Sequence, residues 1–271
     1  MAARYDFGRN WAALAAQLGE EHVAQACEDL RRLVGDIAGR SFLDIGCGSG
    51  LHSVAALRLG AERVLAVDYD SRCVEVSRAT LRRFAPAGGW EVRRADVLKP
   101  ASLPTGHFDI VYAWGVLHHT GDMWAAIRNS AALTAPGGCL AVALYRRTPF
   151  CAIWRLEKRI YASQGWLRPV MKACFTAAVL LARAVRHRDA PSFVRNYRRV
   201  RGMEFMIDVD DWLGGFPYDS VVPEKLEALL ERLGFSLKRN FNTQPRLGLL
   251  GSGCGEWQFE RNGTSGRSLA G

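Results

Sequence analysis

A glycine-rich run that suits a nucleotide follows the first apolar segment of the sequence. It reads Leu43-Asp44-Ile45-Gly46-Cys47-Gly48-Ser49-Gly50. Glycines let the backbone turn tightly and approach a ligand closely, beside the amide-rich start of a helix. Because glycine-rich loops of this kind also serve dinucleotides and flavins, the loop alone leaves the identity of the nucleotide open.

Two further acids narrow the kind of nucleotide that the glycine-rich loop is predicted to bind. Asp68 ends the second apolar run, 18 residues after Gly50. A carboxylate at that place can accept both hydroxyls of a ribose. Asp96 follows the third run, where an adenine amino group would lie. The spacing Gly-x-Gly-x-Gly, in place of Gly-x-Gly-x-x-Gly, disfavours a nicotinamide dinucleotide.

A pair of histidines, His118 and His119, comes just past the fourth apolar run. Histidine suits general-base chemistry near neutral pH, and a base is needed when a nucleophile arrives protonated. The structural alternative is that one of them caps the following helix or packs beneath a ligand. We expect no metal site, since no other ligand cluster with suitable spacing accompanies them.

The elements that position these residues alternate between short apolar runs and helix-length stretches. The apolar runs are Ser41–Ile45, Arg63–Val67, Trp90–Arg94, Phe108–Trp114 and Cys139–Leu144. The helical stretches between them are His52–Leu59, Ser71–Phe84 and Asp122–Ala135. This alternation predicts an α/β fold: a doubly wound, mostly parallel sheet with helices on both faces.

Local signals mark the helix ends. Ser71 and Asp122 are expected N-caps, and Gly137-Gly138 after Pro136 is expected to end the last helix and lead into the fifth strand. Residues 7–38 suggest one or two amphipathic helices. Near the end of the chain we expect a helix at Pro223–Leu233 and strands near Phe235–Phe241 and Glu256–Glu260.

The positive charge is concentrated in one segment. Residues 146–201 hold 14 Arg or Lys and two acids, a net charge of +12, so the remainder of this +9 chain carries −3. The most apolar stretch, Ala173–Ala182, spans about 15 Å as a helix, too little for a hydrocarbon core of about 30 Å. An interfacial helix therefore remains open, whereas a membrane span is not expected.

The motifs together are similar to those of a known family. The Leu43–Gly50 run, the Val67-Asp-Tyr69-Asp and Ala95-Asp-Val97-Leu segments and the Phe108–His119 stretch resemble the class I S-adenosylmethionine-dependent methyltransferases. So does Leu133-Thr-Ala-Pro-Gly-Gly-Cys-Leu140. The resemblance covers about residues 40–145 and 222–261, and implies a Rossmann-like seven-stranded sheet whose last strand is antiparallel.

The resemblance also implies cofactor-binding residues for S-adenosylmethionine. Asp44 with Gly46, Cys47, Gly48, Ser49 and Gly50 would cradle the methionine part, Asp68 and Tyr69 the ribose side, Asp96 and Val97 the adenine, and Trp114 the sulfonium end. His118, and less so His119, would then serve as the base near the methyl group.

The acceptor side is expected at the carboxyl ends of the strands, where ligands of open α/β sheets bind. The substrate-binding residues predicted there are Tyr145, Arg146, Asp211, Trp212, Tyr218 and Glu256. Residues 208–220 are predicted to form a shaped loop, because two glycines and an aromatic-proline pair follow Trp212. A DWLGGxPYxS loop of this kind resembles one in a bacterial subgroup with a helical lid. The alternative is that the loop at residues 208–220 has a hinge or packing role and does not touch substrate.

Four domains follow from these patterns: an N-terminal helical cap (1–40), the methyltransferase core (41–145 and 217–261), a basic helical lid (146–216) and a flexible tail (262–271). The lid is open to several interpretations. Its arginines are solvated or pair with a second subunit in a homodimer, clamp a carboxylate or phosphate, contact anionic lipid as a peripheral membrane surface, or bind RNA. RNA is the least favoured, since no recognised RNA-binding module accompanies the cluster.

We therefore predict an enzyme that moves the methyl group of S-adenosylmethionine to an oxygen or nitrogen of a small-molecule acceptor, a specialised metabolite or a sugar. The alternatives are a quinone- or lipid-like substrate at a membrane surface, RNA, or a non-catalytic partner subunit that binds the cofactor. The seven cysteines are scattered and odd in number, and no secretory signal begins the sequence, so a reducing cytoplasm is expected.

Overall fold

A seven-stranded sheet forms the centre of the computed structural model, which describes residues 7–187, 190–201, 205–241 and 253–263. The strand order is β3-β2-β1-β4-β5-β7-β6. The strands are β1 (Ser41–Ile45), β2 (Arg63–Asp68), β3 (Trp90–Arg94), β4 (Phe108–Trp114), β5 (Thr134–Tyr145), β6 (Phe235–Phe241) and β7 (Cys254–Arg261). β1 to β5 are parallel and β7 is antiparallel to both β5 and β6. The predicted doubly wound sheet with an antiparallel last strand is confirmed.

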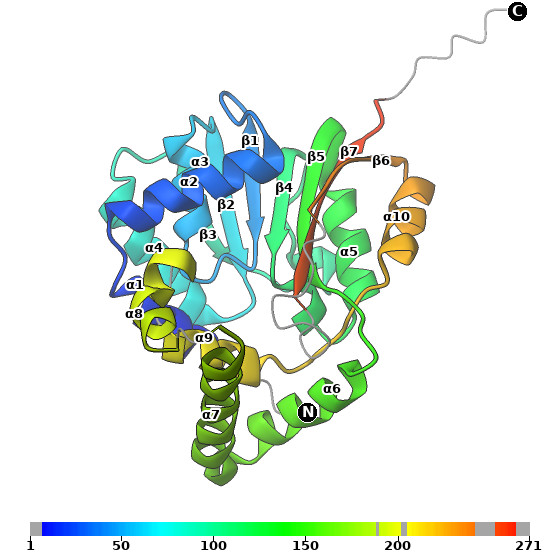
Figure 1. The fold of residues 1–271 in the computed structure, drawn as a ribbon. Coiled ribbons are helices and arrows are strands. Elements are labelled where there is room, and N and C mark those ends of the chain that lie inside the picture. Colours follow the sequence, from blue (N-terminus) through cyan, green and yellow to red (C-terminus); the bar gives the residue numbers. More distant parts are fainter. Residues whose placement is uncertain (1–6, 188–189, 202–204, 242–252, 264–271) are drawn as a thin grey trace, which may run out of the picture.

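Helices cover both faces of this sheet (Figure 1). On one face lie α1 (Phe7–Ala15), α2 (Glu20–Val34), α3 (Leu51–Arg58) and α4 (Ser71–Phe84); on the other lie α5 (Met123–Ala132) and α10 (Pro223–Arg232). Alternate side chains of each strand enter the two cores. In β4, Val111 and Ala113 pack toward α5, whereas Ile110 and Tyr112 pack toward α2 and α3.

The register of the parallel strands brings the predicted site residues to one edge. Asp44 of β1 pairs with Tyr112 of β4, and Ile45 pairs with Val67 of β2. The glycine loop, Asp68 and the two histidines each follow the carboxyl end of a strand in this aligned set. They therefore meet at the same edge of the sheet.

Most predicted boundaries match within two residues, and two predictions about helix ends are wrong. Asp70, not Ser71, is the N-cap of α4, since its Oδ1 accepts the amide hydrogen of Arg72 at 2.8 Å. The chain leaves α5 at Ala132 and enters β5 at Thr134, so Gly137 and Gly138 lie within the strand. Thr134 already pairs with Phe108, and a bulge in the ladder accommodates the Pro-Gly-Gly segment. The predicted N-cap Asp122 is confirmed by a 2.9 Å hydrogen bond from the amide of Ala125.

Four longer helices follow β5 and lie at the carboxyl ends of the parallel strands (Figure 1). They are α6 (Cys151–Ser163), α7 (Arg168–His187), α8 (Ala190–Arg201) and α9 (Phe205–Gly214). Short 3₁₀ turns lie at η1 (Pro100–Ser102), η2 (Leu117–His119) and η3 (Gly165–Leu167).

The predicted loop at residues 208–220 is wrong for its first half, which is the end of α9. Phe205, Val209 and Leu213 recur every four residues and are buried against Tyr161 of α6. This helical spacing of apolar side chains outweighs the turn signal of the glycines, which takes effect only after Gly214. Of the loop expected to join the last two strands, residues 242–252 lie outside the described residues, as do residues 264–271 of the tail.

One segment of the described chain, Gly165–Val185, is long and apolar enough by length and composition to cross a membrane. It exceeds the ten-residue stretch on which the sequence-based expectation rested. None of it is buried inside the protein.

Candidate functional site

The glycine loop adopts a conformation that requires glycine. Gly46, Gly48 and Gly50 have φ of 75°, 52° and 78°, in the left-handed region that side chains disfavour. A Cβ built on Gly46 would lie 2.4 Å from the Val116 side chain. The loop therefore approaches the segment that follows β4 as closely as a bare backbone allows.

Hydrogen bonds from Ser77 anchor the glycine loop to α4. The Ser77 hydroxyl donates to Gly48 O at 3.0 Å and contacts the Cys47 Sγ at 3.1 Å. Cys47 and Ser49 are buried. The contact with Ser77 holds the Cys47 side chain inside the protein.

Two carboxylates lie at the strand ends beside this loop. Asp44 is buried and accepts a hydrogen bond from the Ser53 hydroxyl at 2.6 Å. Burial raises the pKa of Asp44 to about 7; the Ser53 hydrogen bond opposes this rise and the nearby Asp68 adds to it. Asp68 Oδ2 accepts the amide of Gly48 at 3.1 Å, and its Oδ1 accepts the amide of Asp70 at 2.9 Å.

Burial also raises the pKa of Asp68, to about 6, although these backbone hydrogen bonds lower it. The buried Asp44 and the half-buried Asp68 both have raised pKa values and lie at the ends of adjacent strands. A cation or hydroxyl donors would stabilise their ionised forms. This is what the ammonium and ribose of S-adenosylmethionine present.

The residues predicted to bind the adenine side lie along the neighbouring strand ends. Asp96 is half-buried and its Oδ1 accepts the amide of Leu98 at 3.0 Å, while Val97 is buried. The amide of Ala95 donates to Asp68 O at 2.9 Å, which ties the ends of β2 and β3 together. Tyr69 is exposed at the rim beside them.

Trp114 and Glu256 form a link between strands. Trp114 Nε1 donates to Glu256 Oε1 at 2.8 Å, and the Arg32 guanidinium donates to Glu256 Oε2 at 2.6 Å. Both carboxylate oxygens of Glu256 are thus engaged by α2 and β4. The indole of Trp114 is itself partly exposed.

The two histidines differ in their surroundings. His118 is 1% exposed and, among the described residues, neither of its ring nitrogens has a hydrogen-bond partner. Burial lowers its pKa well below the usual range, helped by the charges of His119 and Lys158. His119 is half-buried with Nδ1 2.7 Å from Pro217 O, and burial lowers its pKa to about 4 against the effect of that carbonyl. Both imidazoles are therefore neutral at neutral pH.

An aromatic cluster encloses His118. The Tyr145 ring lies 4.0 Å from the His118 ring, centroid to centroid, and 5.4–5.6 Å from the rings of Tyr218 and Trp212. Three predicted substrate residues from β5, α9 and the following loop are therefore brought together over a predicted catalytic residue.

Arg146 and Asp211 lie at the edges of this group. Arg146 is half-buried, and its backbone bridges to Val221. Asp211 Oδ1 accepts a hydrogen bond from Asn10 Nδ2 at 3.3 Å, which links α9 to α1.

The sequence analysis missed Lys158, a fully buried cation in this cluster. Its Nζ lies 3.9 Å from the centroid of the Trp212 ring and donates to Trp212 O. Burial lowers the pKa of Lys158 to about 8, opposed by the charges of Glu157 and Asp211. In a segment with 14 basic residues, nothing in the sequence distinguished this lysine from the solvated ones.

Trp11 was missed as well. A Cβ built on Gly48 would lie 3.0 Å from the Trp11 ring, so α1 covers the glycine loop. The sequence predicted only one or two amphipathic helices in residues 7–38, and this pattern does not show that Trp11 faces the glycine loop.

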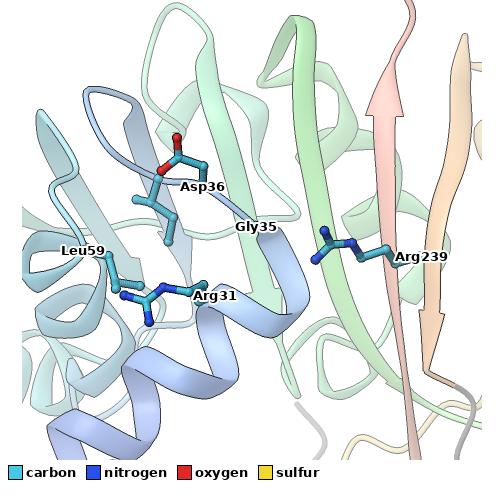
Figure 2. Close-up of a pocket in the computed structure, with 6 residues that line it drawn as sticks. Arg31, Gly35, Asp36, Leu59 and Arg239 are labelled. Carbon is cyan, nitrogen blue, oxygen red and sulfur yellow. The ribbon is translucent and has the colours of Figure 1, made fainter.

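A pocket among the described residues lies away from the glycine loop. It has a volume of about 360 Å³ and is lined by Arg31, Gly35, Asp36, Ile37, Leu59 and Arg239 (Figure 2). These residues surround the end of α2 and the segment before β1, at the opposite end of the sheet from the glycine loop. None of them is a predicted site residue. Within the described ranges no group of three or more His, Cys, Asp or Glu could hold a metal ion.

Comparison with known proteins bears on this site directly. Residues 42–138, which contain the glycine loop, the acids and both histidines, match the family described as "Methyltransferase domain". Over this part of the chain, the match confirms the expected resemblance to the class I S-adenosylmethionine-dependent methyltransferases. The lid and its loop motif stay predictions.

Curated relatives are similar to this chain over part of its length. The ribosomal protein L11 methyltransferase of Pseudomonas paraeruginosa is 39% identical over 140 residues, which cover 49% of this chain and 45% of the relative. The ubiquinone biosynthesis O-methyltransferase of Xanthomonas oryzae pv. oryzae is 39% identical over 114 residues, 42% of this chain and 46% of that protein. The chain thus spans less than half the length of these relatives.

Solved methyltransferases share its fold over most of the chain. An S-adenosylmethionine-dependent methyltransferase from Mesorhizobium loti aligns with a TM-score of 0.55 and 19% identity, covering 88% of this chain and 100% of that one. The magnesium protoporphyrin IX methyltransferase of Synechocystis PCC 6803, solved with bound SAH, aligns at 0.53 and 17% identity, covering 89% and 82%. At these identities the likeness concerns the fold.

Proposed function

We propose that this chain binds S-adenosylmethionine and transfers its methyl group to an oxygen or nitrogen of a small-molecule acceptor. The observation that carries the proposal is His118: a buried, neutral imidazole with no hydrogen-bond partner among the described residues, placed between the cofactor edge of the sheet and the aromatic cluster. A buried polar group without a partner is costly unless a ligand satisfies it.

The cofactor edge fits the group that the family uses. We assign the methionine part to Asp44 and residues Gly46–Gly50, the ribose to Asp68 with Tyr69 beside it, and the adenine to Asp96 and Val97. Trp114 flanks the sulfonium end. When bound, S-adenosylmethionine supplies a methyl group already activated by the adjacent sulfonium. The protein's own contribution is to orient the acceptor and exclude water.

The acceptor side is assigned to the cluster around His118. A hydroxyl acceptor must lose a proton as the new bond forms, and the neutral His118 is the proposed base. Because burial lowers the pKa of His118, the bound acceptor must stabilise the imidazolium that forms. Tyr145, Trp212 and Tyr218 would hold the acceptor and keep water out, while Arg146, Asp211 and Glu256 lie at the edges of the space. His119, whose Nδ1 faces Pro217 O, would position His118 by ring contact at 4.2 Å.

The domain roles follow from this assignment. Residues 41–145 and 217–261 form the cofactor-binding core, residues 146–216 the lid, and residues 1–40 a cap that contributes Trp11. The free cysteines of the described chain fit a cytoplasmic enzyme. Relatives that are named for ribosomal protein L11 and for ubiquinone biosynthesis act on different acceptors, so the family match does not select among acceptors.

One experiment separates the acceptor classes. The purified protein is incubated with methyl-labelled S-adenosylmethionine and an extract of its host, and the organic, aqueous, RNA and protein fractions are counted. Label among aqueous small molecules supports the proposal. Label in the organic fraction indicates a quinone- or lipid-like substrate, and label in RNA or protein contradicts a small-molecule acceptor. Binding of the cofactor without any S-adenosylhomocysteine formed would indicate a non-catalytic partner subunit.

A further inference from the structure

The long helix α7 presents an apolar face to solvent. Every exposed position from Val170 to Val185 is Val, Ala, Cys or Leu, and no charged or polar residue lies among them. Leu181 is 65% exposed and Val185 is 75% exposed. These positions follow the spacing of one helical face, which we call the outer face of α7.

The polar residues of α7 point the other way, into the insertion. Lys172 Nζ lies 2.6 Å from Asp210 Oδ2 of α9, and the Arg183 guanidinium lies 4.1 Å from the centre of the Phe193 ring of α8. Met171, Phe175 and Val179 pack on the same side against the core of α6 and α9. The helix is therefore held along its length by its own insertion, so its outer face is a surface and not a membrane-crossing segment.

The charge of the segment that contains α7, and an exposed tryptophan next to the helix, indicate what covers the outer face. Residues 146–201 carry a net charge of +12, and Arg159 of α6 and Arg195 of α8 are exposed. Trp166, just before α7, is 75% exposed, and tryptophan is enriched where proteins meet the interfacial region of a bilayer. Figure 1 shows α7 at the periphery of the molecule, away from the sheet.

Charge distinguishes the candidate partners. A second copy of the chain would bring an identical +12 segment against this one, and like charges repel. A surface of anionic lipid combines attraction for the arginines with an apolar layer for Val170, Leu181 and Val185. We propose that the outer face of α7 docks on the surface of an anionic lipid bilayer.

Vesicle co-sedimentation tests this docking. Wild-type protein should sediment with vesicles of phosphatidylcholine and phosphatidylglycerol at low salt, at least tenfold more tightly than with phosphatidylcholine alone, and release as salt rises. The double variant Val170→Glu/Leu181→Glu should lose at least tenfold in vesicle affinity. Leu237→Glu, a matched change at an exposed leucine of β6, should bind as the wild type does.

The results that overturn the proposal are equally specific. Absence of binding to anionic vesicles at low salt would do so, as would binding that the double variant retains. A concentration-dependent dimer in light scattering that the double variant abolishes would assign the outer face to a second copy. Circular dichroism and cofactor calorimetry on each variant show that the fold and the methyltransferase core are intact, so a failed proposal here leaves the methyl-transfer proposal standing.

Cys174 offers a local readout, because it is exposed on the outer face. An environment-sensitive fluorophore attached there should shift its emission to shorter wavelength when anionic vesicles are added. Labelled Cys174→Ala protein, in which only the other thiols react, should show no such shift. An unshifted emission from the Cys174 label in protein that sediments with the vesicles would place the contact elsewhere and contradict the proposal.

Discussion

The sheet and the helical insertion arrange charge in opposite ways. In the sheet, the strand interiors are apolar, and the acids Asp44 and Asp68 stand at the strand ends beside the glycine loop. In the insertion, Lys158 is fully buried and the ion pair of Lys172 with Asp210 lies between helices, while the outer face of α7 is apolar. The sheet thus gathers acids at the strand ends beside the glycine loop, whereas the insertion combines internal ion pairs with one apolar outer face on α7.

The strongest test of the proposed cofactor site at the sheet edge is Asp68→Ala. Loss of the carboxylate that we propose as the acceptor of the ribose hydroxyls should weaken S-adenosylmethionine binding by about 3 kcal/mol, on the order of 100-fold, in calorimetry. Asp70→Ala is the matched control, because Asp70 caps α4 and should cost about 1 kcal/mol of stability with little effect on the cofactor. Unchanged affinity in Asp68→Ala would remove the ribose assignment.

His118→Ala tests the proposed general base, which lies where the sheet and the helical insertion meet. Turnover should fall roughly 100-fold, the contribution of a general base, while the cofactor affinity stays the same. His118→Gln fills a similar volume and should show the same loss if the imidazole accepts the proton. Equal activity in either variant would return His118 to a packing role under Tyr145.

The ion pair inside the insertion is tested by Lys158→Met. The variant should lose about 2 kcal/mol in the free energy of unfolding, because Glu157 is left largely buried without its cation. Adding Glu157→Gln should recover most of that loss, as urea unfolding of both variants would show. A Lys158→Met protein as stable as the wild type would mean that the insertion does not depend on this pair.

The pH dependence of cofactor binding gives the smallest effect. The raised pKa values of Asp44, about 7, and Asp68, about 6, mean that both acids gain protons as the pH falls through that range. Because a cationic ligand favours the ionised carboxylates, affinity should fall about tenfold between pH 7.5 and 5.5. Asp44→Asn should flatten this dependence, and a slope unchanged in that variant would assign the titration to another group.

The strand boundaries of the sheet were predicted closely from the sequence. For the insertion, only its helical character and its charge were predicted. Apolar runs, caps and the glycine loop are local signals, so β1, β3, β4 and β6 begin and end at the predicted residues. The burial of Lys158 and the packing of Trp11 on Gly48 depend on contacts between distant segments, which no local pattern encodes. The helical end of residues 208–214 was missed because glycine signals were weighed above a four-residue apolar repeat.

The pairing of β5 with β7 has a consequence for synthesis of the chain. Leu140 to Leu144, an apolar stretch in the middle of the sheet, bonds on one side to residues 255–259. Residues 146–253 are made in between, and at roughly 5–20 residues per second that takes about 5–20 s. During this interval the nascent chain carries an uncovered strand edge. The edge of β5 is covered only after β7 has emerged from the ribosome.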